Sequence, residues 1–287
     1  MYNIRTYNAI SSKGLDRFST DSYTVSEDCA APEGFILRSQ KLHGEPVPAS
    51  LLAVARAGAG VNNIPVADYT QQGVVVFNTP GANANAVKEL IVAGLLLGSR
   101  DIFGGMSYVQ GLGHMNDPAE MGKHLEKEKK RFAGTEIAGK TLGVVGLGAI
   151  GSIIANLALD LGMVVIGYDP AISVEAAWQL SSRVKRMDSL EALLADVDFL
   201  TLHVPAIPAT KHLINTRTLS GMKSTAKILN FAREEIVCTQ AMVAALDKGV
   251  IAGYISDFPA PALLGRKDVL LMPHIGASTE EAEENCA

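Results

Sequence analysis

Short apolar runs alternate with polar or helix-patterned segments along the first part of the chain. The runs with the length and composition of strands cover residues 2–7, 22–25, 34–38, 52–56 and 74–78. Such alternation is typical of an α/β domain, in which a parallel sheet carries helices on its faces. We therefore predict a first domain built on a parallel sheet of about five strands.

The rest of the chain repeats this alternation with longer helical segments. Further apolar runs read as strands at residues 142–145, 163–167, 197–204, 226–231, 251–255 and 269–272, and helices are predicted between them at 190–195 and 240–248. This order predicts a doubly wound parallel (Rossmann) sheet of about six or seven strands.

A long apolar helix is predicted from residue 86 to about residue 100. Its apolar positions cover more surface than a single buried face requires, so we expect it to pack between two domains. We place the boundary there, with a smaller, flavodoxin-like α/β substrate-binding domain at residues 1–94 and the Rossmann domain at residues 95–287. A charged helix over residues 117–131 fits either a solvated face or an arm that contacts a second copy.

Three glycines, Gly146, Gly148 and Gly151, follow the first strand of the second domain in the spacing G-x-G-x-x-G. They open a helix, and Asp169 ends the next strand, which is the context of a dinucleotide-binding loop. The first glycine permits a tight turn, the second lets the backbone approach a pyrophosphate, and the third lets helix and strand pack closely. An acid at Asp169 suits ribose hydroxyls and repels a 2′-phosphate, which favours NAD over NADP. The alternative is a structural unit that binds no ligand.

Composition and charge limit the kinds of molecule that the protein can bind. Across 287 residues, 25 Lys and Arg stand against 30 Asp and Glu, and the net charge of −5 offers no basic surface for nucleic acid or an anionic membrane. A small-molecule substrate is favoured. The three cysteines form neither a disulfide framework nor a metal pattern. No signal peptide and no apolar stretch of about 20 residues is found, so we expect a soluble, cytoplasmic protein without a metal.

Two strand ends in the first domain suggest a binding site for an anion. One strand runs into Arg38, and the next runs into a glycine-rich turn after Arg56. Ligands of parallel sheets gather at the carboxyl ends of the strands, and a guanidinium beside free backbone amides suits a carboxylate or phosphate. The alternative is that both arginines are solvated and the glycines only shape a loop.

Three strand ends of the second domain carry reactive side chains. Arg233 ends the sequence NFAR, Asp257 ends SD, and His274 opens HIGAST. Together with GLGAIG, RAGAGVNN and NTPGANANAVKEL, these stretches resemble the D-2-hydroxyacid dehydrogenase family, and most closely its phosphoglycerate dehydrogenase branch. The resemblance covers nearly the whole chain and keeps the family's order of motifs.

The resemblance implies a role for each of these residues. In that family a 2-oxo acid takes a hydride from NADH at carbon 2 while its carbonyl oxygen takes a proton. Arg233 would hold the carboxylate and polarise the carbonyl, and His274 would donate or remove the proton. The other implied site residues are Gly146, Gly148, Ala149, Ile150, Gly151, Asp169, His203, Val204, Pro205 and Asp257 for the cofactor, and Arg38, Ala59, Gly60, Val61 and Asn85 for the substrate. Taken singly, the two catalytic residues also fit a core histidine and a surface salt bridge.

The sequence departs from the family at one position of the site. The family usually has a glutamate a few residues after the aspartate, where it pairs with the histidine, whereas this chain reads DFPAPA from Asp257. An imidazolium without a carboxylate partner loses stabilisation. We hypothesise that another acid substitutes, with Glu234, Glu280 and Glu281 as candidates because they lie near the catalytic residues in the sequence.

The last residues, 278–287, read as the start of a capped helix. In the family this helix returns to the substrate domain, and a regulatory domain can follow. We expect the returning helix and any regulatory domain to be absent, and the chain to be truncated relative to its gene.

The expected function is NAD-dependent hydride transfer at carbon 2 of a D-2-hydroxy acid, in a cleft between two α/β domains. The resemblance implies 3-phosphoglycerate, the substrate of the first step of serine biosynthesis. Glycerate, hydroxypyruvate or another 2-oxo acid is the nearest alternative. A rival of another class is an NAD(H)-sensing binding protein on the same fold, which only the missing glutamate supports. The resemblance also suggests a homodimer through the cofactor domain.

Overall fold

The computed structural model describes residues 1–287, and the chain forms two compact units. Unit 1 contains Met1–Val87 together with Ile275–Ala287, and unit 2 contains Lys88–His274. The boundary expected after residue 94 therefore lies inside unit 2. The C-terminal segment, expected in the cofactor domain, belongs instead to unit 1 and includes a helix that packs there.

The boundary lies after Val87, before the expected position, because of how helix α3 (Ala84–Ser99) packs. A Cβ on Gly94 would lie 3.1 Å from the side chains of Leu229 and Phe231. A Cβ on Gly98, one helical turn further on, would lie 3.2 Å from Ile255. The two glycines let the second half of α3 lie directly on the strands of unit 2, so this half belongs to that unit.

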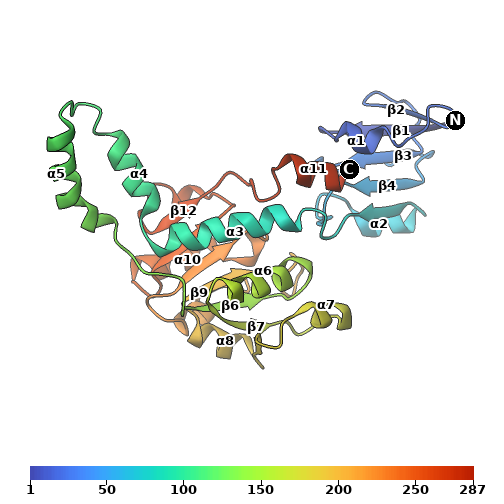
Figure 1. The fold of residues 1–287 in the computed structure, drawn as a ribbon. Coiled ribbons are helices and arrows are strands. Elements are labelled where there is room, and N and C mark those ends of the chain that lie inside the picture. Colours follow the sequence, from blue (N-terminus) through green and yellow to red (C-terminus); the bar gives the residue numbers. More distant parts are fainter. The chain divides into compact units, whose positions relative to one another are not determined.

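Unit 1 is built on a parallel five-stranded sheet in the order β2-β1-β3-β4-β5. Its strands are β1 (Tyr2–Tyr7), β2 (Tyr23–Ser26), β3 (Gly34–Leu37), β4 (Ala53–Arg56) and β5 (Val75–Asn78). Every residue of the central strand β3 is buried, as expected where both faces of a parallel sheet are covered. The helices of the unit are α1 (Ser12–Leu15), α2 (Val66–Gln71) and the C-terminal α11 (Glu280–Cys286), shown in Figure 1.

Unit 2 is built on a parallel seven-stranded sheet in the order β12-β11-β10-β9-β6-β7-β8. Its strands are β6 (Thr141–Val145), β7 (Val164–Tyr168), β8 (Lys185–Arg186), β9 (Phe199–Leu202), β10 (Lys227–Asn230), β11 (Gly253–Ser256) and β12 (Val269–Leu271). The strand order reverses between β6 and β9, which is the switch point of a doubly wound sheet. The prediction of a Rossmann-type sheet is confirmed.

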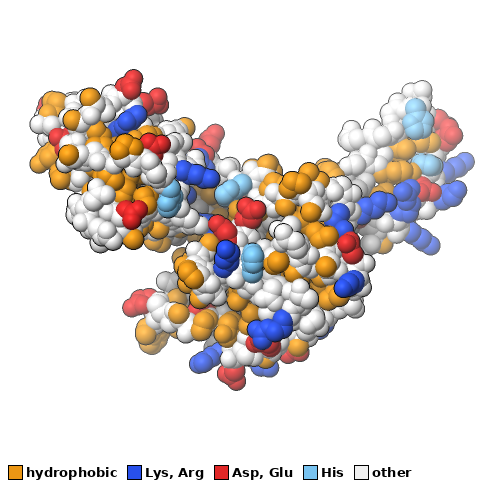
Figure 2. Space-filling view, turned by 180° about the vertical axis from the view of Figure 1, so that it is seen from behind, with side chains coloured by type: hydrophobic (Ala, Val, Ile, Leu, Met, Phe, Trp, Pro, Cys, Tyr) orange, Lys and Arg blue, Asp and Glu red, His pale blue; other side chains and the backbone are white.

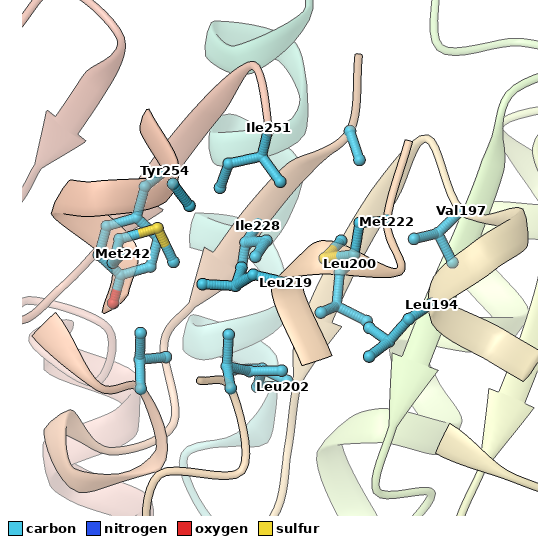
Figure 3. Packing of buried hydrophobic residues seen from close by; sticks show 14 of the residues in the cluster. Leu194, Val197, Leu200, Leu202, Leu219, Met222, Ile228, Met242, Ile251 and Tyr254 are labelled. Atoms are coloured by element: carbon cyan, nitrogen blue, oxygen red, sulfur yellow. The ribbon is translucent and has the colours of Figure 1, made fainter. Parts of the chain in front are cut away.

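Helices alternate with these strands. They are α6 (Ala149–Asp160), α7 (Val174–Gln179), α8 (Leu190–Asp196), α9 (Thr216–Ser220) and α10 (Thr239–Asp247). The main core of the unit packs several of them against one face of the sheet (Figure 3). Leu200, Ile228 and Tyr254 lie in register on three neighbouring strands, and Leu219 and Met242 meet them from α9 and α10. This packing fixes the strands whose carboxyl ends carry the site residues.

Two helices follow α3 and project from the sheet of unit 2 (Figure 1). They are α4 (Ile102–Gln110) and α5 (Pro118–Glu128), and α5 falls within the predicted charged helix. The hydrophobic pattern does not predict α4, which begins where the Asp101 carboxylate accepts a hydrogen bond from the N–H of Gly104 at 2.8 Å. Its exposed apolar side chains are Phe103, Met106 and Val109. Figure 2 shows hydrophobic side chains beside charged ones on this projecting segment.

No single helix is long and apolar enough to cross a membrane. Only α3 and α4 taken together reach the length and composition of a span, and a bend of 75° separates them.

Candidate active site

The glycine loop leaves the end of β6 and opens helix α6. Gly146 has a φ of +88°, and a Cβ there would lie 2.6 Å from the carbonyl oxygen of His203. A Cβ on Gly151 would lie 1.9 Å from the carbonyl oxygen of Gly146. Around Gly148, no other atom lies within 4 Å of a Cβ position. The backbone itself thus requires two of the glycines, and the middle one borders open space at the amino end of α6, which fits a pyrophosphate.

Substitution of Gly151 by alanine is expected to destabilise unit 2 by about 1–3 kcal/mol, because the new methyl group overlaps the Gly146 carbonyl and displaces the loop. NAD affinity should fall with it. Chemical unfolding and calorimetric titration with NAD measure the two effects. Gly148→Ala is the matched control, because its methyl group enters open space: stability should change by less than about 0.5 kcal/mol while NAD affinity falls. Equal unfolding free energies of the two variants would contradict the packing argument.

Asp169 anchors the glycine loop to the end of β7. Its Oδ2 accepts a hydrogen bond from the N–H of Leu147 at 2.8 Å, and its Oδ1 accepts one from the N–H of Ala171 at 2.9 Å. The N–H of Gly146 donates to the carbonyl of Tyr168 at 2.9 Å. Binding of the cofactor's ribose by Asp169, as expected from the sequence, stays a prediction. The loop-anchoring bond to Leu147 is an additional role that the spacing does not indicate.

His203 follows β9 on the other side of the switch point, and Val204 and Pro205 come directly after it. The N–H of His203 donates to the carbonyl of Val145 at the end of β6, at 2.7 Å. Its Nε2 lies 3.0 Å from Oγ1 of Thr201. Burial lowers the pKa of His203 to about 3, so the imidazole is neutral at neutral pH. On the glycine side of the switch point, Ala149 and Ile150 are the first residues of α6, and their N–H groups are among the free donors of the helix.

The lowered pKa of this half-buried imidazole predicts a pH dependence of stability. The unfolded chain binds a proton at the ordinary histidine pKa of about 6.5, whereas the folded chain binds it only near a pKa of about 3. Stability therefore falls as the pH drops through this window, by up to about 1.4 kcal/mol per pH unit, and His203 has no effect above it. Urea unfolding at several pH values should show the wild type losing stability relative to His203→Asn. If the free energies of unfolding of the two proteins change in parallel with pH, His203 is not the source of the pH dependence.

Arg233 lies in a turn after β10 that Asn230 organises. The Asn230 side chain is fully buried, its Nδ2 donates to the carbonyl of Arg233 at 2.9 Å, and its Oδ1 accepts from the N–H of Ala232 at 3.2 Å. Nη1 of the half-buried Arg233 donates to the carbonyl of Ala232 at 2.6 Å. Burial lowers the pKa of Arg233 and the charge of Glu235 opposes this, so the group stays cationic at neutral pH.

The same asparagine joins this turn to the end of β11. The N–H of Asp257 and the Oγ of Ser256 both donate to the carbonyl of Asn230, at 3.1 and 3.3 Å. Oγ of Ser256 also accepts from the N–H of Phe258 at 3.1 Å. Asp257 is 1% exposed. No role is predicted from the sequence for Asn230, Ser256 or Phe258, although a polar residue at the end of a buried strand is a usable signal.

His274 follows β12 and contacts the ring of Phe258, with 5.0 Å between ring centroids and 61° between planes. It has a φ of +57°, and its side chain is exposed. The ion pairs of unit 2 join lysines or arginines to acids, and none includes His274. Glu234 therefore makes no ion pair with His274 in unit 2, and the ring of Phe258 contacts the imidazole. Glu280 and Glu281 belong to unit 1, and their role stays a prediction.

In unit 1, the predicted substrate residues lie at the carboxyl ends of β3 and β4. The carbonyl of Arg38 accepts from Nε of Arg56 at 3.1 Å. Residues 59–61 follow in the loop after β4, where Nδ2 of Asn78 donates to the carbonyl of Ala59 at 2.6 Å. A cavity of about 40 Å³ in this unit is lined by Arg38, Arg56, Gly58, Asn83 and, from α11, Glu283, but not by Ala59, Gly60, Val61 or Asn85. Asn85 is exposed in the first turn of α3.

A larger cavity of about 620 Å³ lies in unit 2 at the opposite edge of the sheet. Lys140 and Asp198, which line it, precede β6 and β9, and Lys227 begins β10. None of the predicted site residues borders this cavity. The Nζ of Lys227 donates to the carbonyl of Gly98 at the end of α3, and burial lowers the pKa of this lysine. Lys227 therefore caps the last turn of α3.

Comparison with known proteins defines the class. Residues 106–276 match the family described as D-isomer specific 2-hydroxyacid dehydrogenase, NAD binding domain. This range contains the glycine loop, the Asn230–Arg233 turn and His274. The chain belongs to the D-isomer specific 2-hydroxyacid dehydrogenase family, and unit 2 carries its NAD-binding domain.

Similarity to individual proteins points to particular enzymes within this family. The chain is 41% identical over 243 residues to a D-3-phosphoglycerate dehydrogenase of Synechocystis, covering 83% of this chain and 41% of the relative. It is 37% identical over 269 residues to the D-3-phosphoglycerate dehydrogenase of Homo sapiens, covering 91% and 47%. The holo D-mandelate dehydrogenase of Rhodotorula graminis superposes with a TM-score of 0.80 at 26% identity, covering 99% of this chain and 91% of that one. The chain spans about half the length of the curated relatives it matches.

Proposed function

We propose that this chain is an NAD-dependent dehydrogenase that transfers a hydride between carbon 2 of a D-2-hydroxy acid and the nicotinamide. The observation that carries the proposal is the placement of Arg233 and His274 after β10 and β12. All strands of this sheet run parallel, so both residues lie on the edge where the glycine loop leaves β6. The open space at Gly148 and the free donors of α6 fit the cofactor's pyrophosphate.

The residues divide the chemistry between them. Bound NAD supplies the hydride acceptor. In oxidation, Arg233 holds the substrate carboxylate with paired N–H donors and keeps carbon 2 oriented. The imidazole of His274 accepts the hydroxyl proton as the hydrogen on carbon 2 leaves with its electron pair, so the carbonyl forms without a charged oxygen. In reduction the imidazolium returns that proton, and Arg233 polarises the carbonyl.

The proposed substrate is 3-phosphoglycerate, which is oxidised to 3-phosphohydroxypyruvate. The names of the curated relatives support this choice. In unit 1, Arg38 and the amides of residues 59–61 offer a guanidinium and backbone donors that suit a phosphate. Hydroxypyruvate and other small 2-oxo acids are the alternative substrates.

Oxidation of NADH by the full chain against a panel of 2-oxo acids tests the proposal. The panel contains phosphohydroxypyruvate, hydroxypyruvate, glyoxylate and pyruvate. We expect the largest kcat/KM for phosphohydroxypyruvate. If kcat/KM for hydroxypyruvate is as large or larger, the substrate is an unphosphorylated 2-oxo acid. NAD binding without turnover of any member would favour the NAD(H)-sensing protein, for which the glutamate missing after Asp257 is the supporting observation.

We further propose that the protein works as a homodimer in the cytoplasm. The exposed apolar side chains Phe103 and Met106, each 65% exposed on α4, support a contact with a second copy. All three cysteines are free, which suits a reducing compartment. Light scattering of the wild type and of Phe103→Asp tests the dimer: a wild-type monomer, or a variant that stays dimeric, would count against this interface.

A further inference from the structure

The C-terminal helix α11 docks on unit 1 through two adjacent glutamates. Oε1 of Glu283 lies 2.5 Å from Nη1 of Arg38, and Oε1 of Glu284 lies 2.6 Å from Nζ of Lys13. In Figure 1 the helix is drawn in red beside the blue strands of this unit. The two ion pairs have similar geometry, but only Arg38 belongs to the proposed substrate-binding residues.

The backbone of Arg38 is fixed without help from Glu283. Its N–H donates to Oδ1 of Asn8 at 3.3 Å, and its carbonyl accepts from Nε of Arg56 at 3.1 Å and from Nδ2 of Asn63 at 3.4 Å. Glu283 therefore acts on the guanidinium alone. The side chain of Arg38 is 31% exposed and that of Glu283 is 43% exposed, so a solute can reach both groups.

Glu283 is the only acidic residue that lines the cavity it shares with Arg38 and Arg56. A carboxylate in contact with a guanidinium offsets its charge and repels a further anion. In the proposed function Arg38 binds the phosphate of the substrate. The repulsion grows with the charge of the group that Arg38 binds, so a phosphate experiences it and a neutral hydroxyl does not.

We propose that Glu283 determines the anion preference of this site, by orienting the Arg38 guanidinium and by weakening the binding of a phosphorylated substrate relative to an unphosphorylated one. Glu283 acts through Arg38 and is a positioning and specificity-determining residue. The inference rests on the proposed function, because it assumes that Arg38 binds substrate.

The test compares Glu283→Gln, Glu283→Ala and Glu284→Gln with the wild type in the full chain. Glutamine keeps a hydrogen-bond acceptor for Arg38 but removes the charge, and alanine removes both. Glu284→Gln is the matched control, because it breaks the neighbouring ion pair of the same helix and leaves Arg38 untouched. KM and kcat are measured for phosphohydroxypyruvate and hydroxypyruvate, and binding of 3-phosphoglycerate is measured by calorimetry.

We expect Glu283→Gln to lower the KM for phosphohydroxypyruvate and the Kd for 3-phosphoglycerate about three- to tenfold, the size of one like-charge repulsion a few ångströms away in a largely aqueous site. The KM for hydroxypyruvate should change less than twofold. Glu283→Ala should bind more weakly than Glu283→Gln, because Arg38 loses its orienting bond. Identical behaviour of Glu283→Gln and Glu284→Gln, or an equal change for both substrates, would overturn the inference. Absence of turnover in the wild type would instead refute the proposed function, and the calorimetric comparison would still decide the role of Glu283.

Discussion

Replacing His274 with asparagine is expected to lower kcat for 2-oxo acid reduction by about 10²–10⁴-fold, the usual contribution of a positioned general acid. An amide can still donate a hydrogen bond to the carbonyl oxygen, but it cannot transfer a proton. Asparagine is the suitable replacement because His274 has a φ of +57°, and asparagine adopts this backbone region readily. The imidazole is exposed, so stability should change by less than about 0.5 kcal/mol.

Single-turnover reduction of the preferred 2-oxo acid with NADH checks this prediction. The wild type has an imidazolium that donates the proton during reduction, whereas the asparagine variant has no proton to transfer. Phe258→Leu is the control, because it keeps the imidazole and removes only the ring contact, and we expect it to cost about two- to tenfold. Retention of the wild-type rate by the asparagine variant would show that His274 does not take part in the proton transfer.

The sequence predicts the two sheets because the signal for a buried parallel strand is local. The inner strands β3, β9 and β11 are short, mostly apolar runs buried at every residue, and neither partner nor register is needed to recognise them. The edge strand β8 (Lys185–Arg186) is charged and exposed, and it carries no such signal. The glycine loop is predictable because its signal is also local: its three positions and the following acid form one continuous segment. Helix α4 is not predicted from the sequence, because Gly104 and Gly105 lower its helix propensity and its apolar residues face solvent.

The candidate site is only partly predictable, because its decisive contacts join residues far apart in the chain. Arg38 and Glu283 are 245 positions apart, and no local pattern connects them. The bonds from Asn230 to the β11 end span 26 positions, and they depend on the strand pairing that brings Asn230 opposite Ser256. The sequence identifies which side chains carry the chemistry, whereas the residues that hold them in place emerge only from the fold.

Replacing Arg233 with lysine is expected to lower kcat/KM by about 10²–10³-fold, although the charge is kept. The guanidinium has a planar fork of donors that can hold a carboxylate and still polarise the neighbouring carbonyl, and an ammonium cannot match both directions. The half-buried position strengthens the effect, because electrostatic interactions are larger where water is partly excluded. The Asn230 bonds involve only the backbone carbonyl of Arg233, so the turn itself should survive the substitution.

Steady-state kinetics and unfolding of Arg233→Lys are to be compared with Arg217→Lys, which makes the same substitution at an exposed arginine of unit 2 that pairs with Glu191. The Arg217 variant should keep the wild-type kcat/KM, since surface ion pairs contribute little. A loss confined to KM in Arg233→Lys would mean that Arg233 only binds the carboxylate, because uniform binding affects ground and transition states alike. A fall in kcat as well would show that its N–H groups also stabilise the charge that develops on the carbonyl oxygen, and this is the outcome we expect from a guanidinium on the same sheet edge as the proton donor.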